Sequence, residues 1–563
     1  MIKLLENKGV DIMKNIRVTV GNETKNYPAG LTYYEISREF DRNRRNKILA
    51  AKINNELFSL DMKCDEDCNI NFVDVTDENG YKMYQAALKF IFILAIRDIF
   101  PGSKVIFEHS VPKGILATVE DVLIENVDIP KVKGKMASII AEDIKFEKLN
   151  IYKKEAIKYY KLQGEKEKAK NIYNKSFDIV NIYRLKDELN YFYTEMPYST
   201  GAIDKFDIRY VGDNRFVLIL PSKRTEGRVP EYVHYQNIID SFYEGKEWLK
   251  KVNVPYLSNL NGLIAKSDIG QFISACELTF NNRVGYAASE IAKNKNIKVV
   301  LIAGPSSSGK TTTTKRLTTY LNILGVKAVC ISADDYFVDK VKTPKDENGN
   351  YDFECLRAIK LEELNEDLDK LISGEEITLP VYDFALGTSA RTGKKIKLEE
   401  NGIILIEGLH SLNDEMTPKI DKSMKYKIYL SPFIPLNIDP HNYISTVDLR
   451  LIRRIIRDFR TRGRSVSESI ESWQSVREGE EKYIFPYIPQ ADTIINTALP
   501  YELNVLKVFV EPLLYSVTYD SKYYEETRRL IEFLKRFYSV SSEYVASSSI
   551  LREFIGWKGD FYD

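Results

Sequence analysis

The chain has 563 residues, with 81 Lys+Arg and 81 Asp+Glu, so its formal net charge is zero. At roughly 150 residues per domain this length predicts about four domains and excludes a single core. Zero net charge gives no overall attraction to nucleic acid or to an anionic membrane. The 44% hydrophobic and 29% charged residues are typical of a globular protein.

The cysteines and the most apolar segment bear on the compartment. The chain begins MIKLLENK, which lacks the apolar run of a signal peptide. Residues 86–100 carry three charges and are too short to span a bilayer, so we expect a buried helix there. We therefore predict a cytoplasmic protein that does not contact a membrane. The five cysteines are too few, too scattered and odd in number for a disulfide framework, and no further Cys or His pair nearby supports zinc at the first two: Cys64, Cys68, Cys276, Cys330 and Cys355.

The first 221 residues mix strand and helix patterns. Residues 16–75 alternate apolar and polar residues as strands do, around a short helical stretch at 33–40, which predicts a small β-rich module. The segment 81–221 has a mixed α+β pattern, in which we expect a long Lys/Glu-rich helix over about 142–175 and strands over 206–220.

The second half changes to alternating strands and helices. Residues 225–296 have apolar residues at helical spacing and predict a helical connector. A strand at 298–303, a glycine loop, an amphipathic helix to 324 and a strand at 326–332 form a βαβ unit, which predicts an α/β fold with a parallel sheet flanked by helices. The predicted boundaries are 1–78, 79–224, 225–296, 297–540 and a tail of 541–563.

The glycine loop carries the most specific motif of the chain. Its sequence GPSSSGKT, residues 304–311, fits the G-x-x-x-x-G-K-S/T phosphate loop between a strand and a helix, as the motif requires. We expect Lys310 to reach the β- and γ-phosphates of ATP and Thr311 to ligate Mg²⁺. The expected nucleotide-binding residues are Gly304, Pro305, Ser306, Ser307, Ser308, Gly309, Lys310, Thr311 and Thr312.

Two acidic residues follow apolar strands at the edge of the sheet where ligands bind in such folds. Asp334 comes directly after the second strand and is the expected base that accepts the proton of an attacking hydroxyl. We favour it over Asp335 because neighbouring strand residues face opposite ways. Glu407 ends the apolar strand 402–407. Mg²⁺ is expected to bind at Thr311, Glu407 and Asp334.

Four arginines recur at i, i+3, i+4 and i+7 after residue 449, so they share one helical face. Only Asp458 is near in sequence to neutralise them, which favours a clamp for phosphate groups. The alternative is a solvated or nucleic-acid-binding face. The four are Arg450, Arg453, Arg454 and Arg457.

Together these motifs resemble the uridine kinase branch of the phosphoribulokinase/uridine kinase family, over residues 298–509. The ordered matches are the phosphate loop, S-A-D-D-Y-F at 332–337, Y-D-F at 351–353, L-P-V-Y-D-F at 379–384, E-G-L at 407–409, the arginine helix and A-D-T-I-I at 491–495. The resemblance implies a P-loop kinase that uses ATP and Mg²⁺ to phosphorylate a nucleoside 5′-hydroxyl.

The resemblance also implies roles for individual residues. The catalytic residues would be Asp334, Lys310, Arg457 and Arg462. Asp352 would bind the ribose hydroxyls and Tyr382 and Phe384 the base. Phe337 and Arg454 would also bind the substrate, whereas Arg464 would bind the nucleotide. The family's base-reading His after the Tyr-Asp-Phe segment is absent from residues 385–391, so the sequence leaves the accepted base open.

The N-terminal half resembles other proteins. Residues 16–75 look like a TGS domain, a β-grasp module, and residues 80–221 resemble the editing domain of threonyl-tRNA synthetases, with much of the match at Tyr81 and in 99–104. Ala86 and Phe90 stand where that family has two His, and 195–200 lacks its Cys and His, so we expect the editing chemistry to be lost. The remaining ligands to consider are RNA, an amino acid, a regulator or another subunit, and zero net charge does not favour RNA.

These observations leave alternative functions. The leading one is a kinase of uridine that gives the 5′-monophosphate, with cytidine as the second candidate substrate. Within the same class the alternative is a phosphoribulokinase-like kinase of another small hydroxyl compound. In a different class, an RNA-associated regulatory protein would use bound ATP as a switch. The acceptor-side residues Asp334, Asp352 and Tyr382 favour the kinase, because a switch does not need them. Uridine kinases are often oligomeric, so a homo-oligomer is one expectation.

Overall fold

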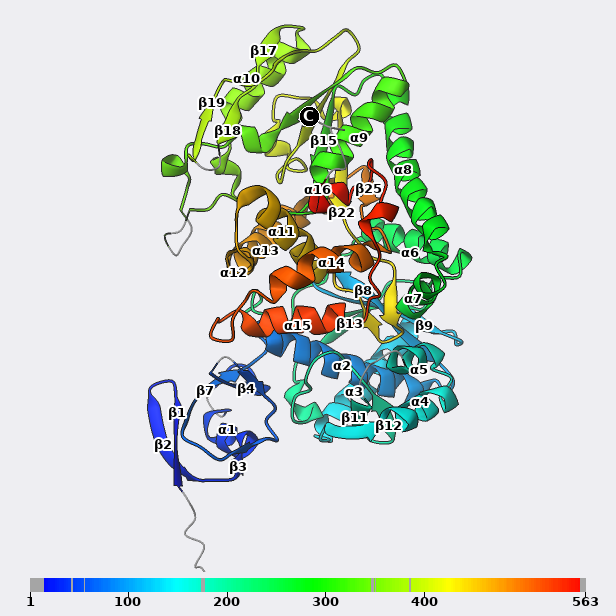
Figure 1. Cartoon of the computed structure of the whole chain (residues 1–563), viewed down its shortest axis with the longest axis vertical. Helices are drawn as coiled ribbons and strands as arrows, with labels where there is room; N and C mark the ends of the chain where they lie inside the picture. Colours follow the sequence, from blue (N-terminus) through cyan, green and yellow to red (C-terminus); the bar gives the residue numbers. More distant parts are fainter. Residues whose placement is uncertain are drawn as a thin grey trace, which may run out of the picture. The chain divides into compact units, whose positions relative to one another are not determined.

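The computed structural model describes residues 15–41, 44–54, 56–173, 178–345, 349, 351–383 and 386–556. The chain forms two compact units. Unit 1 is Met1–Val233 with Asp439–Tyr443, and unit 2 is His234–Ile438 with Ile444–Asp563. The predicted Phe384 lies outside the described residues. Figure 1 labels the elements of both units.

The start of unit 1 is the small β-rich module that the alternation predicts. Ile16 and Val18 are buried on one face of the first strand, as period-2 alternation requires. The strand order in its main sheet is β2-β1-β7-β4-β5, and β3 pairs with β6. The elements are β1 (Asn15–Val20), β2 (Glu23–Pro28), β3 (Leu31–Thr32), α1 (Tyr33–Asp41), β4 (Ala50–Ile53), β5 (Glu56–Phe58), β6 (Lys63–Cys64) and β7 (Cys68–Val73).

The rest of unit 1 surrounds the long helix α2 (Glu78–Ile99). The Asp77 side chain caps α2 by accepting from the backbone N–H groups of Asn79 and Gly80. Two antiparallel sheets, β13-β14-β9-β8 and β10-β11-β12, belong to this part. The other elements are β8 (Lys104–Val111), β9 (Gly114–Glu120), η1 (Asn126–Asp128), α3 (Ile129–Ala141), β10 (Glu147–Tyr152), α4 (Lys153–Leu162), α5 (Lys166–Tyr173), β11 (Ile179–Leu185), β12 (Glu188–Asn190), η2 (Thr200–Ala202), β13 (Asp207–Tyr210) and β14 (Arg215–Ile219).

The predicted long helix over 142–175 is wrong. The segment instead contains β10, α4 and α5, and β10 pairs in antiparallel register with β11. Gly164, between the two helices, has a φ of 74°, a left-handed conformation that ends a helix. Helix propensity of the Lys- and Glu-rich stretch was overridden by sheet pairing with residues that lie about 30 positions later.

Unit 2 is built on a five-stranded parallel sheet of order β16-β21-β15-β22-β25, flanked by helices, as the sequence predicts. Every residue of the central strand β15 is buried. The sheet strands are β15 (Val299–Ala303), β16 (Ala328–Ser332), β21 (Ile403–Glu407), β22 (Lys425–Ser431) and β25 (Thr493–Asn496). The shorter strands are β17 (Glu376–Thr378), β18 (Val381–Asp383), β19 (Thr388–Ala390) and β20 (Lys395–Lys397), and β23 (Asn437–Asp439) pairs with β24 (Asn442–Tyr443) where the chain passes into unit 1 and back.

The segment expected to be a helical connector, 225–296, forms the helices α6, α7 and α8 of unit 2. These helices pack on the sheet domain, because α8 contacts α9 and both α6 and α8 contact β25. The α-helices are α6 (Gln236–Lys251), α7 (Leu257–Ala265), α8 (Ile269–Lys293), α9 (Lys310–Ile323), α10 (Leu361–Ile372), α11 (Thr446–Arg462), α12 (Val466–Glu471), α13 (Trp473–Tyr483), α14 (Glu502–Leu514), α15 (Tyr524–Leu534) and α16 (Arg552–Ile555). The 3-10 helices are η3 (Ala333–Tyr336), η4 (Lys340–Lys342), η5 (Leu356–Ala358), η6 (Asp414–Met416), η7 (Lys422–Met424), η8 (Phe485–Gln490) and η9 (Ser542–Tyr544).

No helix within the described ranges combines the length and the apolar composition that a membrane crossing requires.

Candidate active site

The phosphate loop lies between β15 and α9, in the context that the motif predicts. A Cβ atom at Gly304 would lie 2.6 Å from the Leu430 carbonyl oxygen, so no larger residue fits there. Gly309 precedes α9 with a φ of 86°, which only glycine adopts without strain. The Lys310 ammonium donates to the Gly304 carbonyl oxygen at 2.9 Å. Backbone N–H groups at the start of α9 and this ammonium together favour an anionic ligand.

Thr311 and Glu407 form the pair expected to hold a metal ion. Thr311 Oγ1 donates to Glu407 Oε1 at 3.0 Å, and Glu407 ends β21, whose register pairs it with Ile302 of β15. Burial raises the pKa of Glu407 to about 7, and the charge of Asp334 adds to the rise. Within the described ranges no three His, Cys, Asp or Glu side chains gather as a metal site. A hydroxyl and one carboxylate fit Mg²⁺, which uses few protein ligands beside phosphate oxygens.

Asp334 and Asp335 face different surroundings. Asp335 Oδ1 accepts from the backbone N–H of Tyr382 at 3.4 Å, so this carboxylate is engaged with β18. Burial raises the pKa of Asp335, and the negative charge of Asp334 adds to the rise. Asp334 is exposed and acts electrostatically on Glu407. An exposed carboxylate near the metal-binding pair has the access that a base acting on a substrate hydroxyl needs.

A further acidic residue of the site, Glu354, escaped the sequence reasoning. Burial raises the pKa of Glu354 to about 7, with Asp334 among the charges that add to the rise and Lys310 lowering it. The predicted Asp352 has both carboxylate oxygens engaged: one accepts from the Glu354 N–H at 3.1 Å and the other from the Tyr483 hydroxyl at 2.9 Å. Glu354 follows Asp352 by only two positions, so the Y-D-F segment that pointed to Asp352 could also have pointed to Glu354.

Two of the four arginines on the shared face of α11 form buried ion pairs with acidic residues of the chain. Arg450 forms a buried ion pair with Glu480, and its Nε donates to the Ser306 carbonyl oxygen at 2.9 Å. Arg453 pairs with Glu502 at 2.7 Å, with both side chains fully buried. The prediction that these two arginines form an anion clamp is therefore wrong. Their acidic partners come from α13 and α14, too distant in sequence to be anticipated.

The arginines toward the end of α11 share a single buried carboxylate, Asp458. Arg454 Nε and Arg457 contact Asp458 at 3.4 and 2.7 Å, and Arg462 lies 3.6 Å from it. Arg454 also donates to the Ser306 hydroxyl at 3.1 Å, which brings it to the phosphate loop. Burial lowers the pKa of Arg454 to about 10; the positive charges of the neighbouring arginines lower it further, while Asp458 raises it. The positive charge gathered here suits a phosphate group.

Aromatic rings gather near Asp335, which accepts from the backbone N–H of Tyr382. The Phe337 and Tyr382 ring centroids are 5.6 Å apart in an edge-to-face arrangement, and those of Phe337 and Phe353 are 6.5 Å apart. Tyr382 was predicted as a base-side wall and Phe337 as substrate-binding, whereas Phe353 was not singled out. An apolar wall of this kind suits a flat ring.

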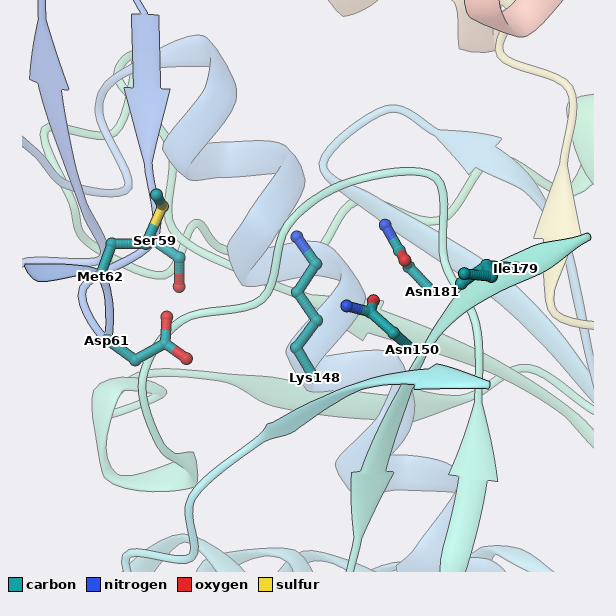
Figure 2. A pocket seen from close by; sticks show the side chains of 7 residues that line it. All are labelled: Ser59, Asp61, Met62, Lys148, Asn150, Ile179 and Asn181. Carbon is teal, nitrogen blue, oxygen red and sulfur yellow. The ribbon is translucent and has the colours of Figure 1, made fainter. Parts of the chain in front are cut away.

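Unit 1 has a polar groove of about 420 Å³ that contains none of the predicted site residues (Figure 2). Figure 2 shows the Asp61 carboxylate and the Lys148 ammonium on opposite sides of this groove. Lys148 also donates to Glu195 at 2.7 Å, so its charge is already balanced by a neighbour. The lining residues are Ser59, Asp61, Met62, Lys148, Asn150, Ile179 and Asn181.

Comparisons with known proteins agree with the phosphate loop and its surroundings. The sequence profile of the Phosphoribulokinase / Uridine kinase family matches residues 299–502. A uridine kinase of Anoxybacillus flavithermus is 32% identical over 198 residues, which are 35% of this chain and 84% of that protein. A uridine kinase of Bacillus subtilis is 32% identical over 202 residues, 36% of this chain and 86% of that protein.

Among solved structures, that of a possible uridine kinase from Bacillus stearothermophilus is 23% identical and covers 38% of this chain and 98% of that one, with a TM-score of 0.27. The identity to the curated relatives, over most of their length, establishes kinship for the second half of the chain. The chain belongs to the phosphoribulokinase/uridine kinase family, and its P-loop domain is that of a kinase acting on a small hydroxyl substrate.

Proposed function

We propose that the protein is a nucleoside kinase that uses ATP and Mg²⁺ to phosphorylate the 5′-hydroxyl of uridine, and also of cytidine. The observation that carries this proposal is the place of the exposed Asp334, two positions after Ser332, which the sheet register pairs with Glu407 of the Thr311–Glu407 pair. A carboxylate base next to a metal-binding pair at a phosphate loop is the arrangement that phosphoryl transfer to an alcohol needs.

Each part of the transfer has a candidate residue in the chain. The backbone N–H groups of the phosphate loop and Lys310 bind the transferred phosphate, and Asp334 accepts the proton of the attacking hydroxyl. Bound Mg²⁺, held by Thr311 and Glu407, would neutralise charge on the β- and γ-phosphates. Arg454, which contacts the Ser306 hydroxyl, adds positive charge on the side of the loop that faces α11.

The acceptor side has a carboxylate and an aromatic wall. Glu354 lies near Asp334 and Lys310 and is the better candidate to accept hydrogen bonds from sugar hydroxyls, because both oxygens of Asp352 already have partners. Tyr382 and Phe337 offer the apolar surface for a base. These two features favour a nucleoside over a sugar phosphate or a small alcohol, because neither alternative has a flat ring to place on the aromatic rings.

The choice of uridine rests on the names of the relatives. The proteins of Anoxybacillus flavithermus and Bacillus subtilis are uridine kinases. The segment after Tyr382 lacks a His, so the base must be read by other groups, and cytidine shares the ribose and the ring size of uridine.

The proposal is tested by measuring ADP release from ATP and Mg²⁺ with a panel of nucleosides, sugars and small alcohols. We expect turnover with pyrimidine nucleosides that exceeds turnover with ribose or glycerate by at least about 100-fold, since a ring stacked on aromatic side chains adds binding that those compounds lack. Turnover only with a sugar or small alcohol would assign the alternative kinase activity. ATP binding without turnover on any acceptor would favour the regulatory switch and contradict the proposal.

The TGS-like and editing-like character of the first 221 residues stays a prediction, as do the homo-oligomer and the cytoplasmic location. Lys205 Nζ donates to the Arg45 carbonyl oxygen at 3.0 Å, a contact within unit 1 between these two parts of the sequence.

A further inference from the structure

The C-terminal segment Ser541–Gly556 packs onto the phosphate loop within unit 2. The Ile550 side chain is buried, and its Cδ1 atom would lie 2.4 Å from a Cβ atom added at Gly309. α16 packs against α11 (Figure 1). The Phe554 ring lies under the Arg453 guanidinium at 4.9 Å. The segment therefore covers the loop and the first turn of α9 from the side of α11.

One side chain of this segment reaches the first turn of α9. Glu553 Oε2 accepts a hydrogen bond from Thr312 Oγ1 at 2.6 Å, and the Thr312 side chain is buried. The negative charge of Glu553 also contributes to the raised pKa of Glu407. Glu553 is thus a carboxylate within the same electrostatic neighbourhood as the metal-binding pair.

The Glu553 carboxylate lies at the N-terminal turn of α9, and the N-terminus of a helix favours an anion. The first N–H groups of α9 have no carbonyl partner inside the helix, and the first backbone bond within it runs from the Thr313 N–H to the Gly309 carbonyl oxygen. The positive end of the helix dipole attracts negative charge. Through the Thr312 hydroxyl the Glu553 carboxylate is held in this first turn, close to the N–H groups that would stabilise a nucleotide phosphate.

We propose that Glu553 is an internal competitor for the nucleotide: the Thr312 hydroxyl exchanges the Glu553 carboxylate for a phosphate oxygen when ATP or ADP binds, and the segment Ser549–Ile555 loosens. The inference rests on the proposed function, because it requires that the loop bind an adenine nucleotide. It assigns the C-terminal segment, which lies beyond the family match at residues 299–502, a role in setting nucleotide affinity.

The test is the dissociation constant of Mg-ADP, measured by calorimetry on the full chain with Glu553→Ala and Glu553→Gln. A charge-assisted hydrogen bond corresponds to a factor of about 10–100 in an equilibrium constant. We expect Glu553→Ala to tighten ADP binding by about tenfold, allowing for partial relaxation of the segment. Glu553→Gln keeps the shape and removes the charge, and we expect a change in the same direction. Glu543→Ala, an exposed acid of the same segment, should leave the affinity unchanged.

A second readout follows the segment itself. The backbone N–H groups of Phe554 and Ile555 both donate to the Leu551 carbonyl oxygen, and their hydrogen exchange reports opening of α16. We expect Mg-ADP to speed exchange in 549–556 of the wild-type chain.

Unchanged or weaker ADP binding in Glu553→Ala, or slower exchange with ADP, would overturn the inference while the kinase proposal stands. Absence of ADP and ATP binding by the wild-type chain would remove the proposed function, and the inference with it.

Discussion

Thr311, in the first turn of α9, donates its hydroxyl hydrogen to Glu407 at the end of β21, with 3.0 Å between Oγ1 and Oε1. This contact joins the end of the phosphate loop to the carboxyl end of β21, although the two residues are 96 positions apart. The parallel sheet creates the relationship, because the carboxyl ends of its strands meet at one edge.

The proposed base can be tested against its neighbour in sequence. We expect Asp334→Asn to lower kcat by about 10²–10⁴-fold, because a positioned base contributes that much to proton transfer. ATP affinity measured without Mg²⁺ should change little, because Asp334 is assigned to the acceptor and to the metal ion and not to the phosphate loop. Asp335→Asn is the matched control, since Asp335 accepts from the Tyr382 N–H instead. The steady-state rate of ADP release with uridine measures both, and an equal loss in the two variants would contradict the assignment of Asp334.

The raised pKa values of Glu407 and Glu354 predict how stability depends on pH. Both pKa values rise from 4.5 to about 7 in the folded chain, so between these pH values the folded state holds more protons than the unfolded state. The contribution of these two groups to stability without ligand should therefore fall as the pH rises from 5 to 7.5. Burial lowers the pKa of His109 to about 3 and that of His410 to about 4, so these histidines contribute in the opposite direction. The difference in thermal unfolding midpoint between the wild-type chain and a variant that lacks one of the glutamates, taken at several pH values, measures the contribution of that glutamate.

Glu407→Gln removes one of these two glutamates, so we expect its unfolding midpoint, relative to that of the wild-type chain, to rise as the pH rises from 5 to 7.5. Glu400→Gln removes the charge of an exposed glutamate in a nearby loop, and its unfolding midpoint should differ from that of the wild-type chain by the same amount at every pH. A difference between Glu407→Gln and the wild-type chain that falls as the pH rises would show that the sign is wrong.

The ion pair of Arg453 with Glu502 is predicted to be structural. Both side chains are fully buried, so Arg453→Met leaves an unpaired carboxylate in the core. Breaking such a pair costs about 3–5 kcal/mol of unfolding free energy. Chemical denaturation of the full chain measures the loss, and Arg453→Met combined with Glu502→Leu should recover most of it. If Arg453→Met weakened nucleotide binding at unchanged stability, the residue would belong to the anion clamp after all.

The aromatic wall is predicted to act on the base. Tyr382 lies against Phe337 at 5.6 Å between ring centroids. Tyr382→Ala should raise KM for uridine by about tenfold through the lost aromatic contact, and KM for ATP should stay unchanged. Val381→Ala alters the neighbouring exposed residue of the same strand and serves as the control. Equal effects on both substrates would place Tyr382 outside the base site.

The chemistry-bearing motif and its sheet could be predicted because they are local. Gly304 to Thr311 is one continuous loop, and the strand before it and the helix after it have clear periodicities. Glu407 and Asp334 could be placed because Glu407 ends one apolar strand and Asp334 follows the end of another by two positions. The residues that the sequence reasoning missed depend on contacts between distant segments.

The acidic partners of Arg450 and Arg453 are 30 and 49 positions away, and the sequence of the arginine helix does not predict them. The long helix expected over 142–175 failed for the same reason, because β10 is held by β11 rather than by its own propensity. The contact of Glu553 with Thr312 spans 241 positions and has no local signal at all.

The measurement that tests the central claim most directly is the identification, by mass spectrometry, of the product formed from ATP, Mg²⁺ and uridine by the full chain. Uridine is compared with 5′-deoxyuridine, which keeps the base and both ring hydroxyls and lacks only the proposed acceptor. The account predicts uridine 5′-monophosphate in amounts equal to the ADP released, and no phosphorylated product from 5′-deoxyuridine. ADP release that is the same with both compounds, or with neither present, would contradict it.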